Sequence, residues 1–363
     1  MNTFPTDYSS ILKRIEAVDP SRYGRTRNFI DGSVTYLSPY VSRGVITLPQ
    51  VRDAVLAKGY SASETEKFVQ ELAWRDYFQR VWHLRGDALF TDLKQSQADV
   101  QHRQIPAALV DAQTGIDAVD AQIRNLYATG YMHNHARMYV AFLACNLARA
   151  HWREPSRWLY FHLLDGDLAS NTCSWQWVAG SFSSKKYLAN QENINKYLHS
   201  NQRGTYLDKD YEQLLDQPVP EPLRTKQNPS LSTRLPDPQP LLLDPEKPLL
   251  LYNSYQLNPL WRSDLDANRV LVLEPSHFAR FPVSDKVMSF VLALAQNIPG
   301  LQVFVGEAGN LPNLGAHPAV YSVAHPLTRH YPGEKDPYPW LFPQVAEPGN
   351  SFFAFWKKCE RYL

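Results

Sequence analysis

Residues 165–177 bring together side chains that rarely occur so close for structural reasons alone. They include two carboxylates, an amide and two indoles. If Asp167 caps a helix, Asn171 lies one turn along the same face, and Trp175 and Trp177 point to roughly opposite sides. Asn171 and Trp175 could then address a large planar cofactor, and Trp177 could stack on a nucleobase. The plainer alternative is two core tryptophans and an ordinary helix cap.

A second cluster lies on a predicted helix. Glu71, Trp74 and Arg75 have the i, i+3, i+4 spacing that gathers an acid, an indole and a guanidinium on one face. Taken alone, the same pattern fits an exposed Glu71–Arg75 ion pair beside a half-buried Trp74.

A third cluster contains an amide, a guanidinium and a thioether. Asn134, Arg137 and Met138 share one face of a predicted helix. The apolar run 139–145 indicates that this helix is largely buried, so Arg137 needs an anionic partner. Asp165 or the phosphate of a cofactor would serve, and both remain open.

A fourth cluster, residues 32–40, places hydroxyls and backbone donors ahead of Pro39, which suits the first turn of a helix. Such a corner can bind phosphate, although a capped turn is the commoner interpretation.

In this order, the clusters resemble the flavin-binding helical domain of the photolyase and cryptochrome family, from about Tyr23 to about Trp177. Several separate motifs in one order make the signal specific. The residues that carry it are Arg27, Thr35, Leu37, Ser38 and Pro39; Glu71, Trp74 and Arg75; Gly115 to Ala121 with Leu126, Thr129 and Gly130; Met132 to Asn134 with Arg137 and Met138; and Asp165 to Asp167 with Asn171, Trp175 and Trp177.

The resemblance implies an FAD cofactor in an all-helical domain. Arg137 and Asp165 would form an ion pair beside the flavin, and Asn171 would face its N5 atom. The implied cofactor-binding residues are Tyr23, Thr35, Leu37, Ser38, Arg75, Arg137, Asp165, Gly166, Asp167 and Asn171.

It also implies a light-dependent lyase that repairs DNA. Photoexcited reduced FAD would give an electron to a cyclobutane pyrimidine dimer flipped out of the strand, and Trp74 and Trp177 would form an aromatic wedge around it. The implied DNA-binding residues are Arg27, Glu71, Trp74, Asn134, Met138 and Trp177. The implied catalytic residues are Glu71, Trp74, Asn171, Trp175 and Trp152, with Trp175 and Trp152 as inner members of a tryptophan chain that passes electrons to the flavin.

Two features depart from the family pattern. The outermost member of that chain lacks a counterpart, since no tryptophan lies between Trp82 and Trp152. Trp158, Tyr127 or Tyr160 could replace it, or photoreduction could be slow. We also expect no counterpart of the family's usual N-terminal α/β domain, because helical sequence starts at about Asp7.

The C-terminal part has a different character. Nine prolines in residues 217–248 predict an extended linker, assigned to 206–248 between domains at 1–205 and 249–363. Apolar runs predict strands at 249–252, 270–273, 303–305 and 320–323, with helices at 284–295 and 352–363. The predicted fold is therefore an all-helical domain followed by a small parallel α/β domain. That second domain is either a relocated antenna-type domain or an unrelated appendage, and any antenna chromophore stays open.

Composition sets the remaining expectations. The net charge is +1, divided into +4 for residues 1–205 and −3 for the rest, which is compatible with a nucleic-acid face on the helical domain. Three scattered cysteines fit a reducing cytoplasm and cannot ligate an iron–sulfur cluster. We expect a cytoplasmic monomer that acts on damaged DNA, without a metal, a membrane segment or a signal peptide.

Three other functions are weighed against dimer repair. A cryptochrome-like photoreceptor would keep the flavin but would not need the lesion-contact residues. Repair of (6-4) photoproducts is disfavoured by Asn134, because that type usually has a histidine pair in the cavity. A nucleic-acid-binding module without flavin would leave Asp165, Asp167 and Asn171 with little purpose.

Overall fold

The computed structural model describes residues 4–363, which fold as two compact units. Each unit is assembled from separate stretches of the chain. The helical unit comprises residues 21–34 and 84–230, and the sheet unit comprises residues 4–20, 35–83 and 231–363. The boundaries predicted above divide the chain along its sequence, and they stay a prediction.

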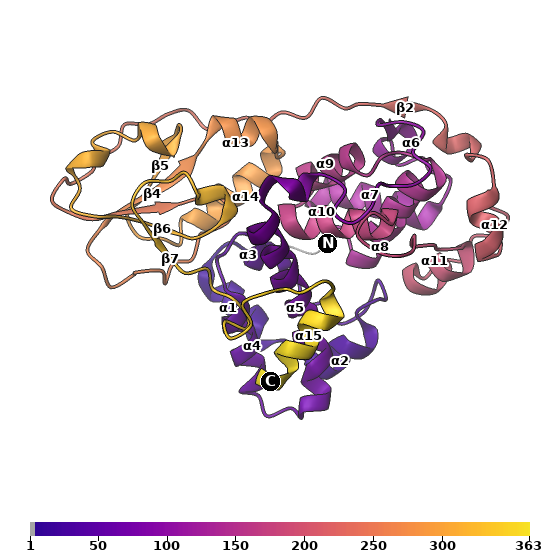
Figure 1. The fold of residues 1–363 in the computed structure, drawn as a ribbon, viewed down its shortest axis with the longest axis horizontal. Helices are drawn as coiled ribbons and strands as arrows, with labels where there is room; N and C mark the ends of the chain where they lie inside the picture. The colour runs from indigo at the N-terminus through magenta and orange to yellow at the C-terminus, as the bar shows by residue number, and fades with distance from the viewer. Residues whose placement is uncertain (1–3) are drawn as a thin grey trace. The chain divides into compact units, whose positions relative to one another are not determined.

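The helical unit consists mainly of helices joined by loops of different lengths (Figure 1). Its longer helices are α7 (Asp117–Thr129), α8 (Asn134–Phe142), α9 (Arg153–His162), α10 (Leu168–Ala179) and α11 (Gln191–Leu198). Its shorter elements are α2 (Pro20–Thr26), η1 (Gly86–Phe90), α6 (Ala107–Val110), η2 (Leu143–Leu147), α12 (Tyr211–Asp216) and η3 (Glu221–Leu223), with β1 (Ile105–Pro106) antiparallel to β2 (Lys226–Gln227).

Helices α8 and α10 form the centre of the helical unit. Helix α8 packs against α7, α10 and α11, and α10 also packs against α9. All residues from 139 to 148 are buried, as the apolar run predicts, and the end of this run forms the π-helical turn η2. Helix α10 starts at Asp167, whose Oδ1 accepts a hydrogen bond from the Ser170 N–H at 2.7 Å. The predicted cap at Asp167 is therefore confirmed.

The sheet unit contains five parallel strands in the order β5-β4-β3-β6-β7. They are β3 (Leu249–Tyr252), β4 (Asn268–Leu273), β5 (Leu301–Val305), β6 (Val320–Val323) and β7 (Glu334–Asp336). The chain runs outward from β3 to β5 and then returns to β6 on the other side of β3, which is the order of a doubly wound sheet. The four predicted strands are present, and β7 is an addition.

Helices and turns complete the sheet unit (Figure 1). The N-terminal helices are α1 (Tyr8–Glu16), α3 (Ser38–Ser42), α4 (Leu48–Leu56) and α5 (Ala62–Arg85), of which α5 ends two residues beyond the unit's boundary. The later elements are α13 (Pro275–Arg280), α14 (Asp285–Ala295), η4 (Ala308–Asn310), η5 (Leu314–Ala316), η6 (Pro326–Thr328), α15 (Phe352–Cys359) and η7 (Glu360–Tyr362). All four residues of β3 are fully buried, which is typical of a parallel strand covered on both faces. The predicted fold class, helices followed by a small parallel α/β sheet, is confirmed.

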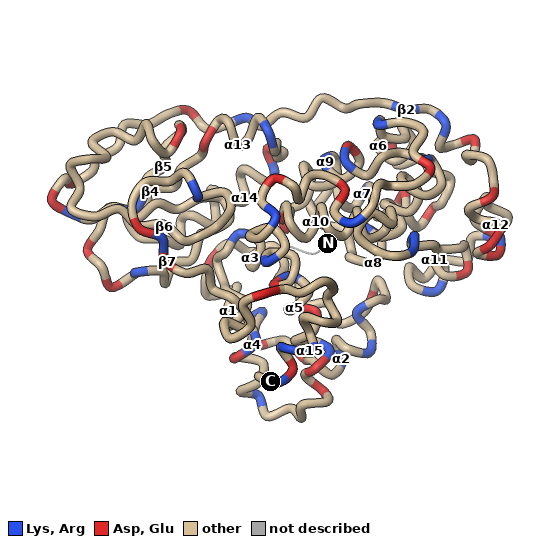
Figure 2. Tube along the Cα trace, in the orientation of Figure 1, with Lys and Arg blue, Asp and Glu red and all other residues tan. Residues whose placement is uncertain are grey.

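Charged residues of both signs are spread along the trace of each unit (Figure 2). Their numbers nearly balance, in keeping with the net charge of +1. Within residues 4–363, none of the helices combines the length and the apolarity needed to cross a bilayer.

Candidate functional site

The predicted site residues are divided between the two units. The helical unit holds Tyr23, Arg27, Asn134, Arg137, Met138, Trp152, Asp165, Gly166, Asp167, Asn171, Trp175 and Trp177. The sheet unit holds Thr35, Leu37, Ser38, Glu71, Trp74 and Arg75.

Arg137 and Asp165 form an ion pair inside the helical unit. Arg137 Nη2 donates to Asp165 Oδ1 at 3.0 Å and to Oδ2 at 2.8 Å. Arg137 Nε donates to the Met132 carbonyl at 2.9 Å, which fixes the plane of the guanidinium. The Asp165 side chain is 4% exposed and that of Arg137 is 20% exposed. The sequence left two anionic partners open for Arg137, the Asp165 carboxylate and a cofactor phosphate. In the structure Arg137 is paired with Asp165.

Helix α10 places its polar and aromatic side chains in different surroundings. Asn171 Nδ2 donates to the Ser156 carbonyl of α9 at 2.9 Å, which fixes the amide and leaves its oxygen as the acceptor it can offer. Trp175 is 2% exposed, whereas Trp177 is 38% exposed and its ring lies 5.9 Å from that of Tyr187. The opposite orientations expected of Trp175 and Trp177 therefore appear as one buried and one accessible indole.

Three buried polar atoms on α8, its N-cap and α10 have no hydrogen-bond partner among the described residues. They are Ser170 Oγ, next to Asn171 on α10, His133 Nε2 at the N-cap of α8, and His135 Nε2 on α8. Buried polar atoms are nearly always satisfied, so a polar ligand that docked here would complete their bonding. Burial lowers the pKa of His133 and His135 to about 4, so both rings are neutral at pH 7.

The other predicted residues of the helical unit lie at its surface or just below it. Asn134 is the exposed first residue of α8, and Met138 is half-buried one turn later. Tyr23 and Arg27 are half-buried, and Arg27 Nη1 donates to the Gly24 carbonyl at 2.8 Å. Trp152, at the N-cap of α9, is 1% exposed.

In the sheet unit, the predicted residues lie around α3 and α5. Arg75 Nη1 donates to Ser42 Oγ at 3.1 Å, which ties α5 to α3. Glu71 pairs with Lys67 at 3.2 Å, a helical i, i+4 pair. Thr35, Leu37 and Ser38 lead into α3, and Leu37 is 3% exposed.

Trp74 is covered by an aromatic ring from the C-terminal helix. The Phe352 ring of α15 lies 3.5 Å from the Trp74 ring, centroid to centroid, at an interplanar angle of 10°. Phe352 is 3% exposed, so the contact is part of the packed interior. One face of the indole that was predicted to stack on a lesion is thus occupied by the chain itself.

Two residues that the sequence reasoning missed support α10 and its neighbours. Gln176 is fully buried between the two tryptophans; its Oε1 accepts from the Leu93 N–H and its Nε2 donates to the Leu89 carbonyl, both at 2.9 Å. Asp92 accepts a hydrogen bond from the Trp152 indole. Gln176 lies within the 165–177 segment, but its sequence position does not indicate which main-chain groups it bonds. Asp92 belongs to no local pattern, so no sequence signal marks it. No group of three or more His, Cys, Asp or Glu within residues 4–363 is arranged to hold a metal ion.

The arrangement defines a helical domain with an internal ion pair, a fixed amide and buried indoles. Comparison with known proteins makes this specific: residues 68–225 match the model of the FAD binding domain of DNA photolyase. The resemblance inferred from the motifs is therefore confirmed for this segment, as is FAD as the cofactor of the matched family.

Individual relatives agree with the family match. A deoxyribodipyrimidine photo-lyase from Streptomyces griseus is 36% identical over 151 residues, which are 40% of this chain and 32% of that protein. One from Synechococcus is 35% identical over 176 residues, 46% of this chain and 36% of that protein. The matches thus span about a third of the length of these curated relatives. Among solved structures, a cryptochrome from Synechocystis is 25% identical with a TM-score of 0.47, over 54% of this chain and 44% of its own.

Proposed function

We propose that this chain binds FAD around α8 and α10 and uses light to split cyclobutane pyrimidine dimers in DNA. One observation carries the proposal. Inside the segment that matches the FAD binding domain, the Arg137–Asp165 ion pair links α8 to the turn before α10, and α10 itself carries the unsatisfied Ser170 hydroxyl and the fixed Asn171 amide. These donors and acceptors fit the polar edge of a flavin.

Each of these residues would have a distinct task. The Arg137–Asp165 pair would hold the cofactor-facing ends of α8 and α10 together, and Ser170 and His135 would supply further hydrogen bonds. The Asn171 oxygen would accept a hydrogen bond without supplying a readily titrated proton. When bound and reduced, FAD supplies an electron to the dimer under blue light.

Trp177 is the side chain best suited to meet the substrate. Its indole is 38% exposed, and stacking of a base on such a ring is worth about 1 to 3 kcal/mol. Asn134 and Met138, at the surface of α8, would line the same substrate region. Trp175 and Trp152, both buried, would pass electrons toward the flavin to return it to its reduced state.

A photoreceptor that keeps the flavin but does not repair DNA is the second candidate. The observation in its favour is the Phe352 ring on Trp74, because a covered indole cannot stack on a lesion from that side. A repair enzyme would then rely on Trp177 alone or would have to displace α15.

The test is an absorption spectrum of the purified protein before and after blue light with a reductant. It is repeated with an oligonucleotide that contains a thymine dimer, in which repair restores the absorbance of thymine. Flavin bands with recovery support the repair enzyme, and flavin photochemistry without recovery supports the photoreceptor. A protein that takes up no FAD even after reconstitution would rule out both.

A further inference from the structure

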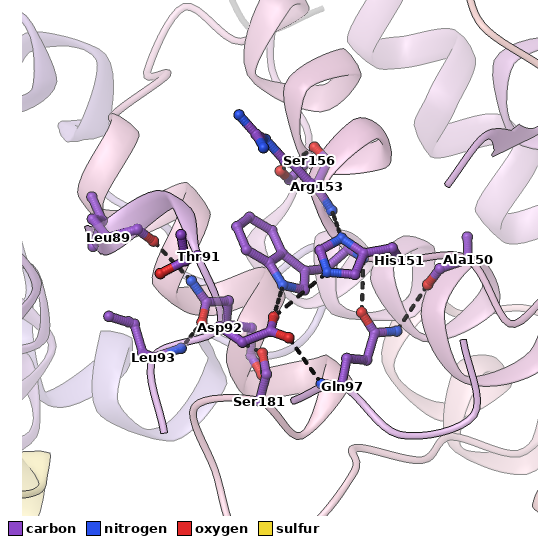
Figure 3. A network of polar contacts seen from close by, with 12 residues as sticks. Leu89, Thr91, Asp92, Leu93, Gln97, Ala150, His151, Arg153, Ser156 and Ser181 are labelled. Carbon is purple, nitrogen blue, oxygen red and sulfur yellow. Dashed lines mark hydrogen bonds and ion pairs between the residues drawn. The ribbon is translucent and has the colours of Figure 1, made fainter. Parts of the chain in front are cut away.

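Trp152 has an ionisable partner at its indole N–H. Trp152 Nε1 donates to Asp92 Oδ1 at 2.7 Å (Figure 3). The indole is 1% exposed, whereas the Asp92 side chain is 23% exposed. The carboxylate therefore connects a buried N–H to the solvent.

The carboxylate is held in a fixed orientation. Asp92 Oδ2 accepts from the main-chain N–H of Gln97 at 3.1 Å, and Gln97 Oε1 accepts from the main-chain N–H of Trp152 at 2.9 Å. Gln97 Nε2 donates to the Ala150 carbonyl at 2.8 Å, which closes the network (Figure 3). Gln97 thus binds both partners and sets their geometry.

A histidine side chain also lies close to Asp92 Oδ1. His151 Nε2 is 3.6 Å from Asp92 Oδ1, and burial lowers the pKa of His151 while Asp92 opposes that shift. At 3.6 Å this contact is too long for a hydrogen bond, so the bonds that Asp92 Oδ1 and Oδ2 accept come from Trp152 and Gln97.

Another buried tryptophan of the helical unit, Trp158, provides a contrast. Trp158, also 1% exposed, donates from Nε1 to the Tyr127 hydroxyl at 3.1 Å, and that hydroxyl donates to the Val110 carbonyl at 2.7 Å. Burial raises the pKa of Tyr127 to about 12. A phenol bonded to a carbonyl is not a base, so of these two indoles only Trp152 has a group that can take its proton.

We propose that Asp92 accepts the N–H proton of Trp152 when light drives oxidation of that indole. The step rests on the proposed function, in which the electron lost by Trp152 goes to the flavin. The resulting indole radical cation is far more acidic than the neutral indole; its N–H bond breaks, and the proton moves to Asp92 Oδ1. The products are a neutral indolyl radical and a carboxylic acid.

The consequence is a longer-lived separation of charge. Once the proton has left, the electron cannot return to Trp152 without the proton returning as well. A thiol in solution restores the indole by giving one electron, while Asp92 gives the proton back. Asp92 is in this sense a proton acceptor for electron transfer and not a contact of the substrate.

The test compares Asp92→Asn with the unaltered protein loaded with oxidised FAD. Asparagine keeps an oxygen that can accept the indole hydrogen bond but lacks the basicity of a carboxylate. After a laser flash, we expect loss of the indole proton to slow on the order of a hundredfold in Asp92→Asn, as when a positioned base is removed. The solvent deuterium isotope effect on the loss of the indole proton should also differ between Asp92→Asn and the unaltered protein. Asp92→Glu, which keeps a carboxylate, should lose the proton much faster than Asp92→Asn.

Three controls separate this role from a structural one. Asp99→Asn changes a carboxylate of the same segment, paired with Lys186 at 2.6 Å, and should leave the rate unchanged. Trp152→Phe identifies which radical signal belongs to Trp152. Ultraviolet resonance Raman spectra of flavin-free protein should show the hydrogen-bonded Trp152 N–H in both the unaltered protein and Asp92→Asn.

The outcomes are distinct. Proton loss at the unaltered rate in Asp92→Asn, with the Raman signature intact, would overturn the assignment. If the protein takes up no flavin, the proposed function is wrong, but the role of Asp92 can still be tested. In that case a flash-generated ruthenium(III) complex oxidises Trp152 in the flavin-free protein. The rates of proton loss in the unaltered protein and in Asp92→Asn are then compared in the same way.

Discussion

At the scale of single residues, the side chains of α10 and its N-cap contact different surroundings. Asp167 caps the helix, Asn171 bonds to α9, Trp175 is buried and Trp177 is accessible. The 3.6-residue period and the chemistry of each side chain are enough to predict this division. We therefore expect substitutions at these positions to affect different measurable properties of the protein.

Trp177→Ala should weaken binding of a dimer-containing oligonucleotide while leaving flavin content unchanged. The lost stacking is worth about 1 to 3 kcal/mol, and the indole is too exposed to be a core residue. Fluorescence anisotropy titrations measure the affinity. Tyr211→Ala, at an aromatic residue 44% exposed in the same unit, is the matched control, and a colourless Trp177→Ala protein would contradict the assignment.

Asp165→Asn should destabilise the helical unit and reduce flavin retention. The variant leaves Arg137, only 20% exposed, without its carboxylate, and a hydrogen bond to a charged group contributes about 1.5 to 3 kcal/mol. Urea unfolding and the ratio of flavin to protein measure the two effects. Full flavin content in the variant would show that the pair does not shape the cofactor site.

Sequence reasoning missed Asp92, the hydrogen-bond partner of the predicted residue Trp152. The two residues are 60 positions apart, and no periodic pattern links them. The Arg137–Asp165 pair could be anticipated because a guanidinium beside an apolar run demands an anion. A neutral indole makes no such demand, so its partner became visible only in the fold.

At the scale of elements, the contact between α15 and α5 changes what Trp74 can do. Besides Phe352, the buried Phe355 contacts α5, since its ring lies 5.7 Å from that of Tyr77. Helix α15 is thus part of the core of the sheet unit and not a loose cover.

Phe352→Leu should make Trp74 more accessible at modest cost in stability. Leucine keeps most of the apolar volume but cannot stack on the indole, and such exchanges usually cost under about 1.5 kcal/mol. Acrylamide quenching, compared with Trp74→Phe in both backgrounds, reports the accessibility. Phe353→Leu, at a neighbour 69% exposed, is the control, and equal quenching of Phe352→Leu and the unaltered protein would contradict the stacked arrangement.

The strands show where sequence patterns suffice and where they fail. Runs such as Leu249–Tyr252 are apolar throughout and predict buried parallel strands. Strand β7, Glu334–Asp336, is three residues long and charged, and it pairs with β6 at the edge of the sheet. Its pairing is set by the backbone, so hydrophobicity gives no signal for it.

At the scale of the whole molecule, buried neutral histidines should make stability depend on pH. Burial lowers the pKa of His83, His133, His135 and His277 to about 4, below the ordinary 6.5. Between these values the unfolded chain binds more protons than the folded one, so stability falls as pH drops from about 6.5 toward 4.

Thermal unfolding between pH 7 and pH 4.5 tests this expectation. The melting temperature should decrease steadily below pH 6.5, and His133→Asn should flatten part of the slope. A melting temperature that stays constant over this range would show that these rings are protonated in the folded protein.

The division into units also bears on how the chain acquires its fold. The main stretch of the helical unit, residues 84–230, lies in sequence between two parts of the sheet unit, and the Leu341 N–H reaches Asp76 Oδ1 across 265 residues. During synthesis, residues 84–230 leave the ribosome before strands β3 to β7 and α15, which belong to the sheet unit together with α5. Long-range pairing of this kind is slow and exposes apolar surface. We therefore expect the sheet unit to fold after the helical unit. Until it has folded, we expect chaperones to bind the exposed apolar face of α5.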